Sequence, residues 1–375
     1  MRTAFTDLVG CTHPLVAFER SPKVVVEASK SGAFGVLAAT AYTAEELDAQ
    51  LTWIESKLDG RPYGVDLLVP EQKVVADRDN LVESLRAQIP QEHIDFVGSL
   101  MDKYDIPQLP PGTATHDPTN TDASKVGGLL DVCFAHDIKL IANALGTPPA
   151  DMVRQAKAKG VPVAALVGKP QHAERQLAAG VDLQIAQGYE AGGHTGEIAT
   201  MILTPEIIDM AGDVPVLTAG GIGSGRQLAA ALMLGAAGGW AGSVWLSTVE
   251  DVAVQAIKDK FLAATSSDTE RNRTRTGKPA RQLISAWHKE WARSGLSTLP
   301  MPLQPMLTLD AWNRIDAAAD DGHAGALELE SFFIGQLVGR FDQIRTTRQV
   351  VDDIMNECRS RLTTAADLAL PDKMP

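Results

Sequence analysis

The stretch VPVLTAGGIGSGRQLAAALMLGAAGGWAGSVW, residues 214–245, contains two short apolar runs joined by a segment of helical character. The runs cover residues 214–220 and 238–245 and contain few polar residues. Runs of this kind are typical of strands that are covered on both faces, as in a parallel sheet. The stretch therefore predicts two parallel strands joined by a crossover helix that begins at Ser224 or Gly225.

The same pattern of an apolar run followed by a helical segment repeats along the chain. Eight such units match a (β/α)8 barrel, that is, a TIM barrel, and an open, doubly wound sheet is the alternative. The eight runs cover residues 14–18, 34–39, 63–69, 138–144, 161–167, 181–187, 214–220 and 238–245.

The alternation is interrupted once and then ends. Residues 70–125, rich in Pro, Thr and Asp, predict a long insertion with some helix between the third and fourth strands. After the eighth run the alternation stops, and segments such as 268–294 have helical patterns. We therefore predict an α/β chain with a barrel over residues 1–250, insertion included. Residues 251–375 are predicted to form a helical C-terminal extension that packs over the barrel mouth as a substrate lid.

Composition limits the classes of partner. The chain of 375 residues has a net charge of -13 and no strong basic cluster, so we do not expect it to bind nucleic acid. Its three cysteines, Cys11, Cys133 and Cys358, show no metal-ligand spacing and no disulfide framework. No signal peptide or apolar run of about 18 residues is present, so we expect a cytoplasmic protein without a membrane span. The composition leaves monomer and homodimer open.

The seventh and eighth strands both end in glycine-containing stretches. The seventh strand ends in Gly220 and Gly221, and the eighth ends with Gly242 and Ser243. The loops after these two strands form the usual phosphate site of a (β/α)8 barrel, where backbone N–H groups and a helix N-terminus favour an anion. A dinucleotide fingerprint fails because its third glycine would fall at Arg226. The alternative is that the glycines only permit tight turns.

The sixth strand ends in the stretch AQGYEAGGHTGE, residues 186–197. Gln187 ends the strand, where its amide can donate and accept toward the edge of a flat heterocycle. Gly192 and Gly193 permit close approach of the backbone, and His194 follows them. A neutral imidazole can accept a proton from a carbon acid at cellular pH, so His194 is the candidate base. A purely structural histidine is the alternative.

These motifs together resemble the nitronate monooxygenase family. The resemblance is carried by AQGYEAGGHTGE and by PVLTAGGIGSGRQLAAALMLGAAGGWAGSVWL, and more loosely by SKSGAFGVLAATAYTAEEL, TRTGKPARQL and FFIGQLVGR. It implies a barrel that binds flavin mononucleotide (FMN). The four residues at the tips of strands seven and eight would hold the phosphate. Gln187 would face the isoalloxazine ring, with Gly192 and Gly193 beside it, and His194 would be the catalytic base.

Two positions depart from the family pattern. The first strand ends in VAFER, so Phe18 or Glu19 is expected against the flavin in place of the usual stretch. The third strand carries GVD, which places Asp66 where the family has a neutral amide. A carboxylate there would disfavour the anionic reduced flavin unless it is protonated or paired.

The resemblance implies oxidation of nitronates or nitroalkanes with O2 to a carbonyl compound and nitrite. His194 would remove the α-proton, and Arg20 could contact the anion unless it is a solvated loop arginine. An NAD(P)H-dependent reductase of quinones or enoyl thioesters on the same barrel is the first alternative. A flavin-binding protein without catalysis is the second. No metal is expected.

Overall fold

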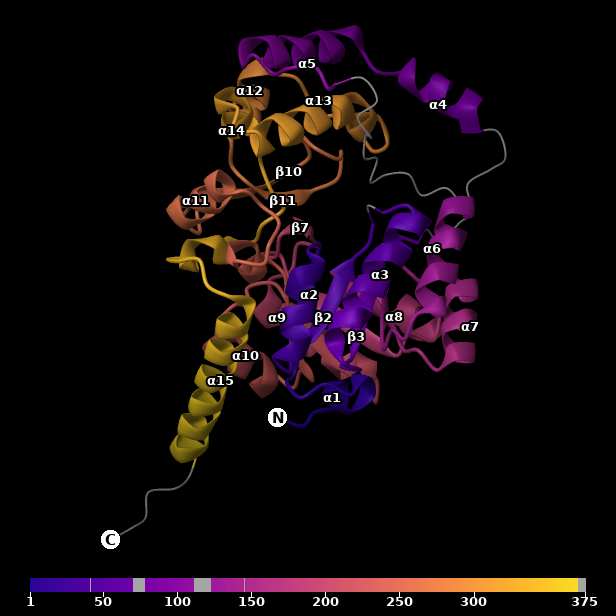
Figure 1. Ribbon diagram of the computed structural model, residues 1–375, viewed down its shortest axis with the longest axis vertical. Coiled ribbons are helices and arrows are strands. Elements are labelled where there is room, and N and C mark those ends of the chain that lie inside the picture. The colour runs from indigo at the N-terminus through magenta and orange to yellow at the C-terminus, as the bar shows by residue number, and fades with distance from the viewer. Residues whose placement is uncertain (41, 70–77, 111–122, 145, 370–375) are drawn as a thin grey trace.

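The eight predicted strands form a closed barrel of parallel strands in the computed structural model (Figure 1). The structure describes residues 1–40, 42–69, 78–110, 123–144 and 146–369. The barrel closes because β1 pairs with both β2 and β9, which confirms the TIM barrel and excludes the open sheet. The strands are β1 (Leu15–Glu19), β2 (Phe34–Ala38), β3 (Tyr63–Leu67), β4 (Ile141–Asn143), β5 (Val163–Val167), β6 (Leu183–Gln187), β8 (Val216–Ala219) and β9 (Gly238–Ala241).

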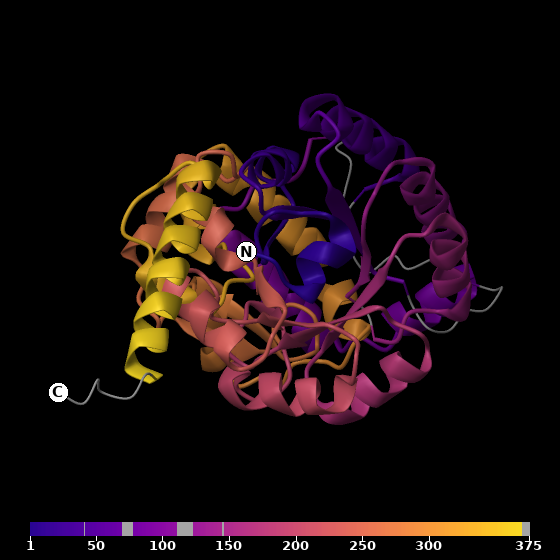
Figure 2. The ribbon, with the colours of Figure 1, turned by 90° about the horizontal axis from the view of Figure 1, so that it is seen from below.

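Helices cover the outside of the barrel, so each strand is buried on both faces as its apolar run predicts. The short helix α1 (Ala4–Val9) lies across the bottom of the barrel (Figure 2), where Phe5 meets Phe34 edge to face at 5.8 Å. The outer helices are α2 (Pro22–Lys30), α3 (Ala44–Leu58), α6 (Ala123–Ala135), α7 (Ala150–Lys159), α8 (Pro170–Ala178), α9 (Thr200–Ala211) and α10 (Gly225–Met233).

The described part of the insertion extends beyond the barrel. It forms α4 (Arg78–Arg86) and α5 (Gln91–Lys103), whereas residues 70–77 and 111–122 lie outside the described residues. Above the barrel, α5 packs against the tail helices α12 (Ala286–Ser294), α13 (Leu303–Asp320) and α14 (Ala324–Leu329) (Figure 1). The insertion and the tail therefore share one hydrophobic core, built around Trp287, Trp291 and Trp312 together with Leu100 and Met101.

The tail is not wholly helical, and the helix predicted across residues 268–283 is wrong. After α11 (Gln255–Ala263), the chain forms β10 (Thr269–Asn272) and β11 (Ala280–Leu283), an antiparallel pair. Gly277 has φ +73°, and Pro279 follows two residues later. Both residues disfavour a continuous helix. They indicate a turn more strongly than the charged pattern around them indicates a helix. The third strand of this small sheet is β7 (Gly193–His194).

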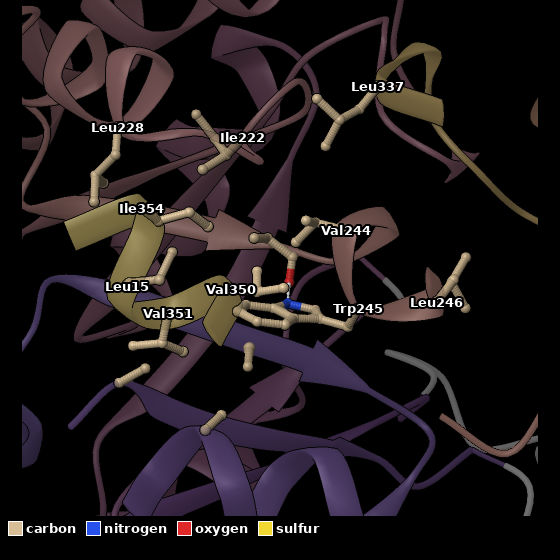
Figure 3. Packing of buried hydrophobic residues seen from close by; sticks show 14 of the residues in the cluster. Leu15, Ile222, Leu228, Val244, Trp245, Leu246, Leu337, Val350, Val351 and Ile354 are labelled. Carbon is tan, nitrogen blue, oxygen red and sulfur yellow. Dashed lines mark hydrogen bonds between the residues drawn. The ribbon is translucent and has the colours of Figure 1, made fainter. Parts of the chain in front are cut away.

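The last helix, α15 (Thr347–Ala369), packs against α10 on the side of the barrel (Figure 2). Figure 3 shows Val350 and Ile354 of this helix near Leu15 of β1 and the indole of Trp245. Trp245, in the 3-10 helix η1 (Ser243–Ser247), donates from Nε1 to the Ala241 carbonyl oxygen at 2.7 Å. The two helices approach closely because Gly225 has no side chain to separate them. A Cβ there would lie 2.4 Å from the Ile354 carbonyl oxygen.

Within these described ranges, no helix has both the length and the apolar character needed to cross a membrane.

A methyl group at Gly225 should push α15 away from α10. We expect Gly225→Ala to lower the free energy of unfolding by about 1–3 kcal/mol, the usual cost of overpacking a tight contact. Gly98 of α5 is the matched control, because a Cβ at that helical glycine meets no atom within 4 Å. Gly98→Ala should be neutral or stabilising. Chemical denaturation of both variants measures the difference, and equal unfolding midpoints would contradict the close packing.

Candidate active site

A cavity of about 600 Å³ opens at the carboxyl ends of the barrel strands. This volume lies within the range of about 300–1,000 Å³ that small-molecule sites occupy. Strand ends line its lower part, and segments of the C-terminal tail line its upper part. All ten residues that the sequence singled out contribute to its wall, and they are Phe18, Asp66, Gln187, Gly192, Gly193, His194, Gly220, Gly221, Gly242 and Ser243.

The tips of β8 and β9 present backbone and a hydroxyl to the cavity. Gly220 and Gly221 have φ values of +97° and +72°, a conformation that favours glycine. A Cβ on Gly220 would lie 2.8 Å from Oγ1 of Thr200, so the chain has no room for a side chain there. Beside them, Ser243 accepts a hydrogen bond from the Gly335 N–H at 2.9 Å. That bond leaves the Ser243 hydroxyl proton available for an acceptor in the cavity.

The sequence suggested that the first turn of α10 contributes to the anion site, but this turn does not line the cavity. The helix does begin at Gly225 as predicted, but the cavity-lining residues include Gly221 and Ile222 and none of the next three. The Arg226 N–H donates to a carboxylate oxygen of Glu357 at 3.3 Å. This carboxylate, which belongs to α15, compensates the positive end of α10. The groups that face the cavity for an anion are therefore those of the two strand tips.

The lower wall of the cavity combines aromatic rings with polar side chains. The rings of Phe18 and Trp240 pack at 5.4 Å between centroids and both line the cavity. Gln187 ends β6 as predicted. Asp66 of β3 is 1% exposed, and neither of its carboxyl oxygens has a hydrogen-bond partner among the described residues. Burial raises the pKa of Asp66 well above its usual range.

Glu19 lines the cavity together with Phe18, so both of the residues offered for the end of β1 face it. The Glu19 carboxylate accepts a hydrogen bond from the Arg20 N–H at 2.7 Å. Burial raises the pKa of Glu19 to about 8, and repulsion from Asp251 adds to the shift. The end of β1 therefore places an acid that titrates near neutrality beside the ring pair.

His194 is held at the cavity by its strand pairing. As part of β7 it pairs with Ala280 of β11, and its Nε2 lies 2.8 Å from Oγ1 of Thr276. The Thr276 hydroxyl is also placed to donate to the Lys278 carbonyl oxygen at 3.2 Å. When it does so, Nε2–H of His194 donates to Thr276, and Nδ1 is the basic nitrogen.

The charge state of His194 also follows from its surroundings. The ring is open to the cavity, yet desolvation by the atoms around it and the positive charge of Lys278 lower the pKa of His194. The imidazole is therefore neutral at cellular pH, as a base requires.

The upper wall is held together by Arg275, which the sequence did not single out. Its guanidinium donates to the Ser331 carbonyl oxygen at 2.9 Å and lies 4.0 Å from the ring centroid of Trp312. It is also 5.2 Å from the ring of Phe333 and 3.6 Å from a carboxylate oxygen of Asp316. Arg275 therefore joins the β10–β11 hairpin, the α13 helix and the segment after α14 above the cavity.

Two further ionisable residues, Glu330 of the tail and Arg20 after β1, also line the cavity. The carboxyl of Glu330 has one buried oxygen without a partner among the described residues, and burial raises its pKa to about 8. Arg20 lies with its guanidinium 5.9 Å from the ring of Phe332. Arg275, Phe332 and Phe333 belong to the segments TRTGKPARQL and FFIGQLVGR. The only signal in the sequence was that resemblance, because nothing in their spacing shows that they fold back over the barrel.

Taken together, the fold and the cavity define a (β/α)8-barrel enzyme with its site at the carboxyl ends of the strands. The model of the nitronate monooxygenase family matches residues 3–357, and the chain belongs to that family.

Three similar proteins match nearly the whole chain. A Mycobacterium tuberculosis protein provisionally named as a monooxygenase is 49% identical over 361 residues, which cover 95% of this chain and 96% of that protein. A Rhodococcus jostii protein named as an octahydro-indene-carboxyl-CoA dehydrogenase is 27% identical and covers 96% of this chain and 97% of its own. The structure of a nitroalkane oxidase from Streptomyces ansochromogenes superimposes with a TM-score of 0.77 at 25% identity and covers 97% of this chain and 100% of its own.

The pKa values of the His194 and His136 imidazoles should be shifted in opposite directions from the ordinary value of about 6.5. His136 is the internal control. Burial alone would lower its pKa, but hydrogen bonds to Glu55 and Asp48 outweigh burial and raise it. Resonances assigned with His194→Asn and His136→Gln should move below and above the ordinary value in an NMR titration. A pKa for His194 above that of His136 would contradict the described environment.

Proposed function

We propose that the protein is a flavin-dependent oxidoreductase that uses FMN and oxidises nitronates or nitroalkanes with O2 to a carbonyl compound and nitrite. One observation carries this proposal. Eight residues that the family resemblance assigns to FMN and to the reaction come from distant parts of the sequence, yet they line one cavity together with Phe18 and Asp66, where the chain departs from the family pattern. Family membership and the nitroalkane oxidase neighbour support the same reaction class.

The groups on the cavity wall fit FMN. The two strand tips offer backbone N–H groups and the Ser243 hydroxyl proton for a phosphate. Phe18 and Trp240 offer a flat apolar surface for a ring system. The partnerless carboxyl of Asp66 requires a polar ligand atom because buried polar groups are normally hydrogen-bonded. Gln187, Gly192 and Gly193 complete the proposed ring site.

The side chains around the cavity have separate roles in the proposed reaction. The bound flavin supplies the electron acceptor. His194, neutral and held through Nε2 by Thr276, takes the α-proton of a nitroalkane on Nδ1, or contacts a nitronate that is already formed. Arg20 supplies positive charge for the nitronate, which the net charge of -13 on the chain does not attract. The tail segment around Phe332 and Phe333 covers the site and limits its access to water.

The Rhodococcus jostii relative favours a second candidate. Its name assigns it a carboxyl-CoA dehydrogenase activity, and it matches 96% of this chain. On this candidate the same flavin site would reduce an acyl thioester with NAD(P)H as the electron donor in place of O2 chemistry, or oxidise it with NAD(P)+ as the electron acceptor. The two candidates differ in what reduces the flavin.

Purified protein should show the visible absorption of a bound flavin, and anaerobic titration separates the two candidates. On the leading proposal a nitronate bleaches the flavin band, whereas NADH and NADPH leave it unchanged over the same period. Bleaching by NADPH but not by a nitronate would favour the thioester candidate. A colourless protein that takes up no FMN would contradict both.

Replacement of the proposed base should separate chemistry from cofactor binding. We expect His194→Asn to keep its flavin and to lose about 10²–10⁴-fold in turnover of a neutral nitroalkane, the usual contribution of a general base. Turnover of the preformed nitronate should fall less, because its proton has already left. His172→Gln is the control, since His172 lies on α8 outside the cavity wall. If His194→Asn and the parent turned over both substrates at equal rates, His194 would not be the base.

A further inference from the structure

Asp66 differs from the other buried acids of the cavity. Glu19 has a hydrogen-bond donor in the Arg20 N–H and a charged neighbour in Asp251. The Glu330 carboxyl lies in the fields of Asp316 and Lys260. The Asp66 carboxyl has no partner on either oxygen among the described residues, although it is 1% exposed. Its hydrogen bond therefore has to come from a molecule in the cavity.

The residues directly opposite Asp66 on the neighbouring strands are apolar. Its register partners are Ala38 on β2 and Ala142 on β4, both small and apolar. Burial is the cause of its raised pKa, without a contribution from a charged neighbour. The titratable and charged groups that face the same cavity from other elements are Glu19 at the end of β1, Arg20 after it, His194 on β7, and Arg275, Asp316, Asp320 and Glu330 in the tail.

These surroundings decide which form of the acid the site accommodates. A carboxylate there would be a buried charge without a hydrogen bond, which is among the most costly arrangements in a protein. The neutral acid costs much less, and it presents one O–H donor in addition to its acceptor oxygen. A ligand atom with a lone pair is the natural partner of that donor.

We propose that Asp66 is an uncharged acid that donates a hydrogen bond to an acceptor atom of the bound flavin ring, and that this proton sets how readily the flavin is reduced. The inference rests on the proposed flavin site. Reduction adds negative charge to the ring, which a neutral donor stabilises and a carboxylate repels. When pH rises through the pKa of Asp66, the carboxyl ionises, the added electrons are stabilised less, and the reduction potential falls.

The test compares the parent with Asp66→Asn, which keeps an N–H donor and a similar shape but cannot ionise. The flavin midpoint potential is measured against pH by spectroelectrochemistry. In the parent we expect a pH interval in which the midpoint potential falls more steeply with pH. Within that interval, reduction of the flavin by two electrons takes up one further proton. The interval should be absent from Asp66→Asn. Contributions from Glu19, Glu330 and His194 are common to both proteins and cancel in the comparison.

Two further measurements separate a redox role from a structural one. The infrared spectrum of the parent at neutral pH should contain a protonated-carboxyl C=O band that Asp66→Asn lacks. Asp66→Leu, which has no donor, should bind FMN about 3–10-fold more weakly than Asp66→Asn, as expected for the loss of one hydrogen bond. If the leucine variant does not fold, the asparagine variant still decides the question.

The outcomes distinguish this inference from the proposed function. Parent protein that binds no FMN overturns both. Parent and Asp66→Asn that both bind FMN, with the same dependence of potential on pH and no difference in the carboxyl band, overturn the role of Asp66 alone and leave the flavin site intact.

Discussion

The parallel closure of the barrel is the constraint on which the site depends. Because every strand runs in the same direction, the ends of β1, β3, β6, β8 and β9 meet on one rim, and side chains from distant parts of the sequence reach one cavity. The rim also requires residues without side chains at the tip of β8, where a Cβ on Gly220 would collide with Thr200. The same glycines that permit the turn line the cavity with backbone atoms and no side chain.

The second half of the site comes from outside the barrel. Arg275 holds the tail above the cavity through a carbonyl oxygen, a carboxylate and two aromatic rings. The tail in turn shares its hydrophobic core with α5 of the insertion. Two segments that interrupt or follow the barrel pattern therefore stabilise each other, and the tail supplies the upper wall of the cavity.

The protonation states of the ionisable side chains in the cavity depend more on loss of solvent than on ion pairs. Burial raises the pKa values of Asp66, Glu19 and Glu330, whereas desolvation by nearby atoms and the charge of Lys278 lower the pKa of His194, whose ring is open to the cavity. All four groups are thereby shifted toward their neutral forms. A site of this kind suits a flat, polar ring and a reaction in which a proton leaves carbon, because neutral acids donate hydrogen bonds and a neutral imidazole accepts the proton.

The sequence alone determined the eight strands, the barrel and the residues at the strand ends, because period and apolar character are local properties that a parallel barrel requires of each strand. It misassigned residues 268–283 as helix, although Gly277 and Pro279 marked the turn. Only the tertiary structure decided that Arg275 and Phe332 line the cavity and that Glu357 lies at the start of α10. It also decided that the Asp66 carboxyl has no hydrogen-bond partner in the described part of the chain. Each of these depends on which distant segments meet, and spacing along a chain carries no information about such contacts.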